Sequence, residues 1–241
     1  MGNTERQWGE KVVLLYDGAK AMGVRHLAEA LVPGSSSSSS LKREVCKISW
    51  DDTSIEPHVT GEIVHFIDSN DVTQVSIVVL SNKVPASMCA HVNRQLFEVL
   101  WASAPVHSPA FTLIVPAITS VPLSALEKEG QDNDVAICKA VLYGASEVHK
   151  GVYSGLPRLA PTFPLRDGFL AYLMQFVHIS SLPTLLILGS SKADASEVIR
   201  LLGDIVAQQV GLTYVKKEIS NYVDLPDPAS GVEDDWRRLY I

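Results

Sequence analysis

The chain has 241 residues, which is long enough to bury a full hydrophobic core as one large domain or two small ones. Its 46% hydrophobic and 20% charged residues are ordinary for a globular protein, so global disorder is excluded. The net charge of -7 argues against a nucleic-acid partner, because too few cationic groups are available to neutralise phosphates.

The sequence also argues against a membrane or secreted location. No apolar run reaches the length of a membrane span, and the polar segment from Met1 to Lys11 does not resemble a secretory signal. The cysteines, Cys46, Cys89 and Cys138, are odd in number and have no C-x-x-C spacing, which is typical of reduced thiols. We therefore expect a cytoplasmic or nuclear protein with no membrane partner.

Short apolar runs alternate with helical stripes along most of the chain. Runs rich in β-branched residues predict strands, and apolar side chains repeated at helical spacing predict amphipathic helices. The predicted strands cover residues 12–16, 45–50, 63–67, 75–80, 111–115 and 184–188, with a further strand expected within 212–219. The predicted helices have their apolar stripes within residues 22–31, 92–101, 165–177 and 198–210. This alternation predicts an α/β domain with helices on both faces of a largely parallel sheet.

Several local signals refine these elements. Pro116 is expected to stop the strand at 111–115, and the segment 134–143 fits either a helix or a strand. Ser191 and Asp194 have capping-box spacing at the start of the last helix, and Gly211 stands where a left-handed C-cap is needed.

The sequence also predicts how the chain is divided into a domain, a loop and a tail. The serine tract Ser35–Ser40 is predicted to be a flexible surface loop. With no internal repeat and no linker, we expect one domain at about residues 8–219, followed by an extended C-terminal tail at 220–241.

A phosphate-binding loop and a serine nucleophile are both poorly supported. Gly18 and Gly23 match the spacing of a P-loop, but the lysine and hydroxyl that hold phosphate and magnesium are missing, and no G-x-G-x-x-G is present. Asp17 is interpreted as part of a turn. Ser191 lies on a predicted strand-to-helix turn, yet the last histidine is His178, so the order found in α/β-hydrolases is absent.

Metal and thiol chemistry are no better supported. The histidines have no H-E-x-x-H spacing and no paired cysteines, so we interpret them as structural. Cys89 and Cys138 lie in apolar surroundings and are predicted to be inert buried thiols. We predict no cofactor, no metal and no catalytic residue. The alternative is an α/β-fold hydrolase or nucleoside-binding enzyme whose site is built from scattered residues.

The last three residues, Leu239-Tyr240-Ile241, have the chemistry of a small ligand. They offer an apolar side chain, a phenol and a carboxylate that can pair with Lys or Arg. The preceding stretch contains Pro226 and Pro228, which favour an extended segment. Capture of a chain end in a pocket is a known mode of recognition, although by composition alone about one chain in a hundred would end this way.

The order of elements resembles the proteasome assembly chaperone 1 family. The resemblance depends on residues 11–31, 111–124 and 165–188, the last of which reads as a helix followed by the strand after Ser181-Leu182-Pro183. Members of this family end in hydrophobic-Tyr-any residue (HbYX), which Leu239, Tyr240 and Ile241 match. The resemblance implies a three-layer α/β/α sandwich related to nucleoside phosphorylases, without their catalytic residues.

The resemblance also implies a function and partners. The protein would be a non-enzymatic chaperone for assembly of the proteasome core particle, acting as a heterodimer with proteasome assembly chaperone 2. Its tail would enter a pocket between α-subunits of the ring, where the Ile241 carboxylate pairs with a lysine. Tyr240 would pack in the groove and Leu239 would add apolar contact.

Three features depart from the family pattern. Thr184 stands where the family tends to have a small Ala, and the serine tract has no counterpart that we can place. The acidic Glu233-Asp234-Asp235 has no counterpart either. It is the more important departure, because its charge must suit the surface that receives the tail.

Overall fold

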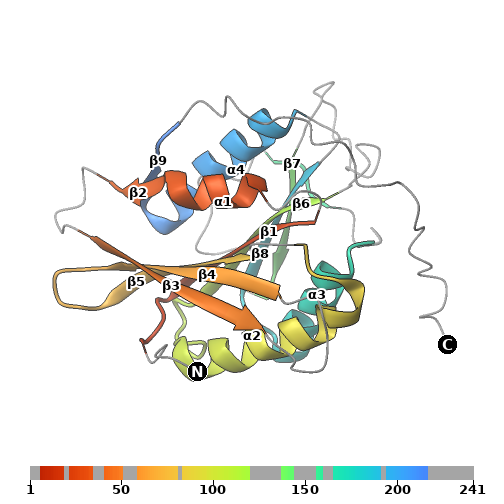
Figure 1. The fold of residues 1–241 in the computed structure, drawn as a ribbon, viewed down its shortest axis with the longest axis horizontal. Coiled ribbons are helices and arrows are strands. Elements are labelled where there is room, and N and C mark those ends of the chain that lie inside the picture. The colour runs from red at the N-terminus through yellow and green to blue at the C-terminus, as the bar shows by residue number, and fades with distance from the viewer. Residues whose placement is uncertain are drawn as a thin grey trace.

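The computed structural model describes residues 6–18, 22–34, 41–50, 59–80, 83–119, 137–143, 156–159, 165–190 and 194–216. These residues form helices on both sides of a central sheet (Figure 1). The strands are β1 Lys11–Asp17, β2 Leu31–Pro33, β3 Lys42–Trp50, β4 Val59–Ile67, β5 Thr73–Leu80, β6 Thr112–Thr119, β7 Ile137–Leu142, β8 Thr184–Ser190 and β9 Leu212–Tyr214. The helices are α1 Met22–Ala30, α2 Cys89–Ser103, α3 Gly168–Ser180 and α4 Ala195–Val210, with a 3-10 turn at Ala86–Met88 before α2.

The described part of the sheet has seven strands in the order β3-β4-β5-β1-β6-β8-β7. Strand β1 pairs in parallel with β5 and β6, and β6 pairs in parallel with β8. The outer strands β3, β4 and β7 are antiparallel to their neighbours. The predicted α/β fold with a largely parallel sheet is therefore confirmed, with antiparallel additions at both sides.

Alternation along the central strands divides the core into two layers. Val12, Leu14 and Tyr16 of β1 face the layer that contains α2 and α3. Val13 and Leu15 face the layer that contains α1 and α4. All five side chains are at most 1% exposed, so both faces of β1 are covered. Figure 1 shows the two helix pairs on opposite sides of the sheet, which gives the three-layer sandwich.

The helix ends follow ordinary capping chemistry. Asp167 caps α3 by accepting a hydrogen bond from the Leu170 N–H at 3.0 Å, and Asp194 caps α4 by accepting one from the Ser196 N–H at 2.8 Å. Gly211 ends α4 with φ of 77°, which confirms the predicted left-handed cap. Among the described helices, none combines the length and apolar character needed to cross a bilayer.

The prediction that Pro116 stops its strand is wrong. Strand β6 continues through Pro116 to Thr119, and its pairing with β8 is unbroken, with Pro116 opposite Ile187. On the other side, the parallel register with β1 is interrupted between Ile114 and Ala117. Proline has no N–H to donate, so it is tolerated where the ladder to one neighbour is already broken.

Other expectations need smaller corrections. The ambiguous segment 134–143 contains an edge strand, β7, and the last predicted strand shrinks to β9, which pairs with β2 in a separate small sheet. Asp194, rather than Ser191, is the N-cap of α4. Ser191 and the serine tract lie outside the described residues.

Gly61 provides a test of the packing between β3, β4 and β5. A Cβ at this position would lie 2.5 Å from the Val79 carbonyl oxygen and 2.7 Å from Cζ3 of the Trp50 ring. We expect Gly61→Ala to lower the free energy of unfolding by about 2 kcal/mol, because backbone and a buried indole must both move. Urea denaturation measures this change.

The matched control is Gly211→Asn. This residue is at positive φ, no atom lies within 4 Å of the position that a Cβ would occupy, and asparagine tolerates that backbone conformation. Its stability should stay within about 0.5 kcal/mol of the parent chain. Equal stability of the parent and Gly61→Ala would contradict the packing described for these strands.

Candidate functional site

The predicted binding residues of the tail lie outside the described part of the chain. Leu239, Tyr240 and Ile241, together with the whole segment 217–241, are not placed by the structure. Their role in binding therefore stays a prediction. Two places in the described part are candidate sites. One is at the carboxyl ends of the parallel strands, and the other is a cleft at their amino ends.

The carboxyl ends of the parallel strands are the usual place for a ligand in α/β proteins. Asp17 at the end of β1 is in register with Ile118 of β6, and Thr119 of β6 is in register with Ser190 of β8. Asp17 and Ser190 are only 2% and 3% exposed. Asp17 is the last residue of β1 and is buried, so our interpretation of it as a turn residue is wrong: the turn begins at Gly18.

At the carboxyl end of β1, a hydrogen bond joins Tyr16 to Asp167. The Tyr16 hydroxyl donates to Asp167 Oδ2 at 2.9 Å, and the other carboxylate oxygen caps α3. The Tyr16 ring packs against Phe169 with ring centroids 4.6 Å apart. A Cβ on Gly18 would lie 2.6 Å from Asp167 Oδ2, so a larger residue here would force the carboxylate to shift. Asp167 is thus committed to holding β1 and α3 together.

The titratable groups beside this hydrogen bond are held in their neutral forms. Burial raises the pKa of the Tyr16 phenol well above its ordinary value, and the charge of Asp167 raises it further. Burial also raises the pKa of the Cys89 thiol to about 11, again with help from Asp167. The Cys138 pKa is raised to about 11 by burial alone. Cys89 and Cys138 are both buried, as predicted, and at neutral pH neither is a reactive thiolate.

A serine and a histidine do meet in the described part, but in the interior. His65 of β4 lies opposite Ser76 of β5, with Nδ1 3.0 Å from Ser76 Oγ. Ser76 is fully buried and its Oγ also accepts a hydrogen bond from the Gly9 N–H at 3.1 Å. Burial lowers the pKa of His65, with a smaller contribution from the charge of Arg6. No substrate could reach this pair, so it is a structural contact, as we expected for the histidines.

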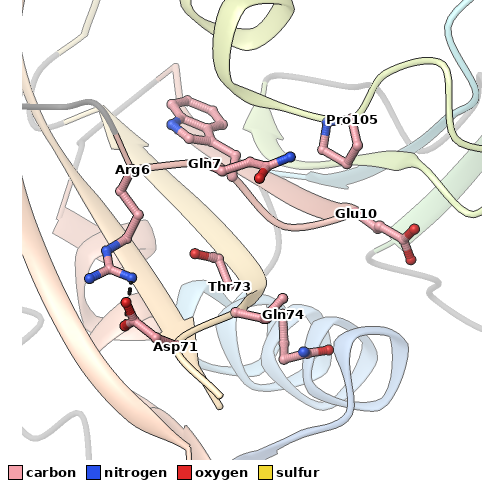
Figure 2. A pocket seen from close by; sticks show the side chains of 9 residues that line it. Arg6, Gln7, Glu10, Asp71, Thr73, Gln74 and Pro105 are labelled. Carbon is pink, nitrogen blue, oxygen red and sulfur yellow. Dashed lines mark hydrogen bonds and ion pairs between the residues drawn. The ribbon is translucent and has the colours of Figure 1, made fainter. Parts of the chain in front are cut away.

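The cleft lies at the amino ends of β1 and β5 and has a volume of about 750 Å³. Figure 2 shows residues 6–10 on one side and the turn before β5 on the other. Arg6 spans the entrance, with its guanidinium 3.0 Å from Asp71 and 3.4 Å from Glu44. Glu10 accepts a hydrogen bond from the Ser108 hydroxyl at 2.8 Å.

This cleft has a mostly polar lining. Its lining offers carboxylates, amides, a guanidinium and one threonine hydroxyl, but no histidine or cysteine. It also lies at the amino ends of the parallel strands, whereas α/β enzymes bind their ligands at the carboxyl ends. Among the described residues, no three His, Cys, Asp or Glu side chains are grouped so as to hold a metal ion.

Comparison with protein families identifies the chain. The family described as a domain of unknown function, DUF7894, matches residues 7–241. The chain belongs to this family. A comparison with curated protein sequences finds no match.

Solved structures show which proteins share the fold. PbaB of Pyrococcus furiosus, an archaeal proteasome activator, is similar over 86% of both chains, with 12% identity and a TM-score of 0.54. A protein of unknown function from Thermoplasma acidophilum is similar over 88% of this chain and 81% of that one, with 8% identity and a TM-score of 0.58. At these identities the comparison establishes a shared fold.

A further similar structure is described as a proteasome-assembly chaperone homologue of Mycobacterium tuberculosis. It has 10% identity over 84% of this chain and 86% of that chain. Its TM-score of 0.46 is too low to support an argument about this chain.

The Tyr16–Asp167 contact predicts a specific dependence of stability on pH. Above the ordinary tyrosine pKa of 10, an unfolded chain ionises this phenol while the folded chain keeps it protonated. Unfolding then releases a proton, so stability must fall as the pH rises, by about 1.4 kcal/mol per pH unit from this residue. Tyr16→Phe should be less stable at pH 8 but should lose this part of the slope between pH 10 and 11.

Urea denaturation of both chains at several pH values measures the difference in slope. Phe97→Leu, which removes a buried ring from α2 but no titratable group, is the control and should keep the slope of the parent chain. Identical slopes for the parent and Tyr16→Phe would show that the Tyr16 phenol ionises as easily in the folded state as in the unfolded one.

Proposed function

We propose that this protein is a non-enzymatic chaperone that binds the proteasome core particle during its assembly. The observation that carries this proposal is the fold shared with an archaeal proteasome activator over 86% of both chains. A second feature supports it independently, because the chain contains a hydrophobic-Tyr-X sequence at Leu239, Tyr240 and Ile241.

The chemistry of the sheet edge agrees with a role without catalysis. In related α/β architectures this edge carries the ligand, whereas here Tyr16 and Asp167 are bonded to each other and the Cys89 thiol is protonated. The contact between Tyr16 and Asp167 links β1 to the start of α3. We therefore place the function on the surface of the protein and in its tail.

The proposed mode of action is insertion of the tail into a pocket between α-subunits. The Ile241 carboxylate would pair with a lysine, Tyr240 would pack its ring in the groove, and Leu239 would fill an apolar recess. By the same reasoning, proteasome assembly chaperone 2 is the proposed partner in a heterodimer, and the cytoplasm, with the nucleus, is the proposed location.

A tail of three residues is a weak ligand by itself. An aromatic anchor contributes about 2 kcal/mol or more, and the entropy lost when a peptide is ordered on binding cancels part of this gain. A lasting complex needs a second contact that raises the effective concentration of the tail. We propose that the folded domain or the partner chaperone supplies it.

Removal of Leu239, Tyr240 and Ile241 tests the proposal. We expect the truncated chain to lose binding to purified core particles or α-rings by at least about tenfold, because one aromatic anchor and one charge pair disappear. Its melting temperature should match that of the full chain. Co-sedimentation with untagged protein measures the binding.

Two variants serve as controls for this truncation. One extra alanine after Ile241 keeps every native side chain but displaces the carboxylate, so binding should fall almost as far. Ile241→Leu keeps the carboxylate in place and should bind normally. If the truncated chain binds as well as the full chain, the tail is not the recognition element.

A further inference from the structure

Strand β3 forms an outer edge of the seven-stranded sheet (Figure 1). All nine of its residues, Lys42–Trp50, pair with β4 in an antiparallel ladder. In the described part of the chain, no strand pairs with the other side of β3. Alternate N–H and C=O groups on that side are therefore available to a further strand.

The opposite edge of the sheet is different. The Lys139 N–H of β7 donates to the Pro157 carbonyl at 3.0 Å, and the Leu159 N–H donates to the Lys139 carbonyl at 2.8 Å. The segment around Arg158 thus covers the middle of β7. Of the two outer strands, β3 is therefore the one on which the described residues leave room for a further strand.

One face of β3 carries a regular pattern of exposed side chains. Arg43, Val45 and Lys47 alternate along the strand and are all exposed, Val45 by 47%. The other face turns toward the core, where Ile48 and Trp50 pack in the layer of α2 and α3. A strand added beside β3 would therefore meet a cation, an apolar side chain and a second cation on its outer face.

The charges of the β3 side chains themselves are not balanced. Glu44 is paired with Arg6 at 3.4 Å, and Glu62 of β4 is paired with Arg25 at 3.4 Å. In contrast, the cationic side chains Lys42, Arg43 and Lys47 have no ion-pair partner among the described residues. The strand itself thus carries three cations and one carboxylate, while Glu62 of β4 lies opposite Lys47.

A second copy of this chain fits the edge poorly. Two β3 strands related by a two-fold axis at Val45 would place Arg43 of each copy opposite Lys47 of the other. Like charges directly across a strand pair are destabilising. A shift in register by two residues separates these cations, but it leaves Arg43 and Lys47 with no carboxylate opposite them.

We propose that β3 binds an extended segment of another protein that carries acidic, apolar and acidic side chains at alternate positions. The two carboxylates would lie opposite Arg43 and Lys47, and the apolar side chain would cover Val45. Because Val45 is at the centre of the pattern, a parallel and an antiparallel segment satisfy it equally. The backbone ladder provides affinity, and the charge pairs select the acidic partner.

The test uses the full chain and two synthetic peptides of the same length as β3. Both have valine at the central position and a charged residue two positions away on each side, and all other positions are threonine. The charged residues are glutamates in the acidic peptide and lysines in the basic one. Fluorescence anisotropy measures binding. We expect the acidic peptide to bind at least about tenfold more tightly than the basic one, with a preference that weakens in high salt.

Charge reversal at the strand gives the decisive comparison. Arg43→Glu combined with Lys47→Glu should reverse the preference, so that the basic peptide binds more tightly. Arg94→Glu combined with Arg200→Glu changes the net charge equally on α2 and α4 and should keep the original preference. A neutral pair, Arg43→Gln with Lys47→Gln, should abolish the preference without reversing it.

Hydrogen exchange locates the bound peptide. The proposal requires new protection of amides within Lys42–Trp50 when the acidic peptide binds. It is overturned if neither peptide binds the parent chain, or if the control pair loses the preference as fully as the strand variant. It is also overturned if sedimentation shows a dimer of the parent chain that Arg43→Glu with Lys47→Glu dissociates, since a second copy would then occupy the edge.

Discussion

The burial of β1 on both faces and along both edges is the constraint on which the rest of the structure depends. Its side chains from Val12 to Tyr16 are at most 1% exposed, and its backbone pairs with β5 and β6. A strand in this position needs helices above and below, which the crossover connections of a parallel sheet provide. The two-layered core then follows from the alternation of its side chains.

At the carboxyl end of β1, two polar side chains are bonded to each other. The Tyr16 hydroxyl and the Asp167 carboxylate satisfy each other, and Gly18 allows their approach. A network of this kind stabilises the fold because an unpaired carboxylate or phenol at a buried site is costly. The sites of recognition that we propose are instead peripheral, in the tail and on strand β3.

The sequence indicates the frame well because its signals are local. The apolar runs that became β1, β5 and β8 are short, rich in β-branched residues or leucine, and bounded by turn residues. The prediction for Pro116 was wrong because the sequence does not show which neighbouring strand a residue would bond through its N–H. A proline is tolerated where that pairing is already interrupted. Strand β7 was ambiguous because a short apolar run fits two periodicities.

The sites were less visible from sequence for a different reason. Tyr16 and Asp167 are 151 positions apart, and neither residue belongs to a motif. His65 and Ser76 are 11 positions apart and meet only because β4 and β5 pair in one particular register. The cleft likewise joins residues 6–10 to the turn before β5. Only the pairing of strands brings such residues together, and a single sequence does not state that pairing.

The order of strands in the sheet has a consequence for synthesis on the ribosome. Strands β1 and β3 to β6 are neighbours in space and lie within the first 119 residues, so they can assemble early. Strand β7 emerges next, yet its only strand partner in the described sheet is β8, which is translated later, after a delay on the order of seconds. Until then β6 presents an open edge, and β7 can join the sheet only once β8 has paired with β6.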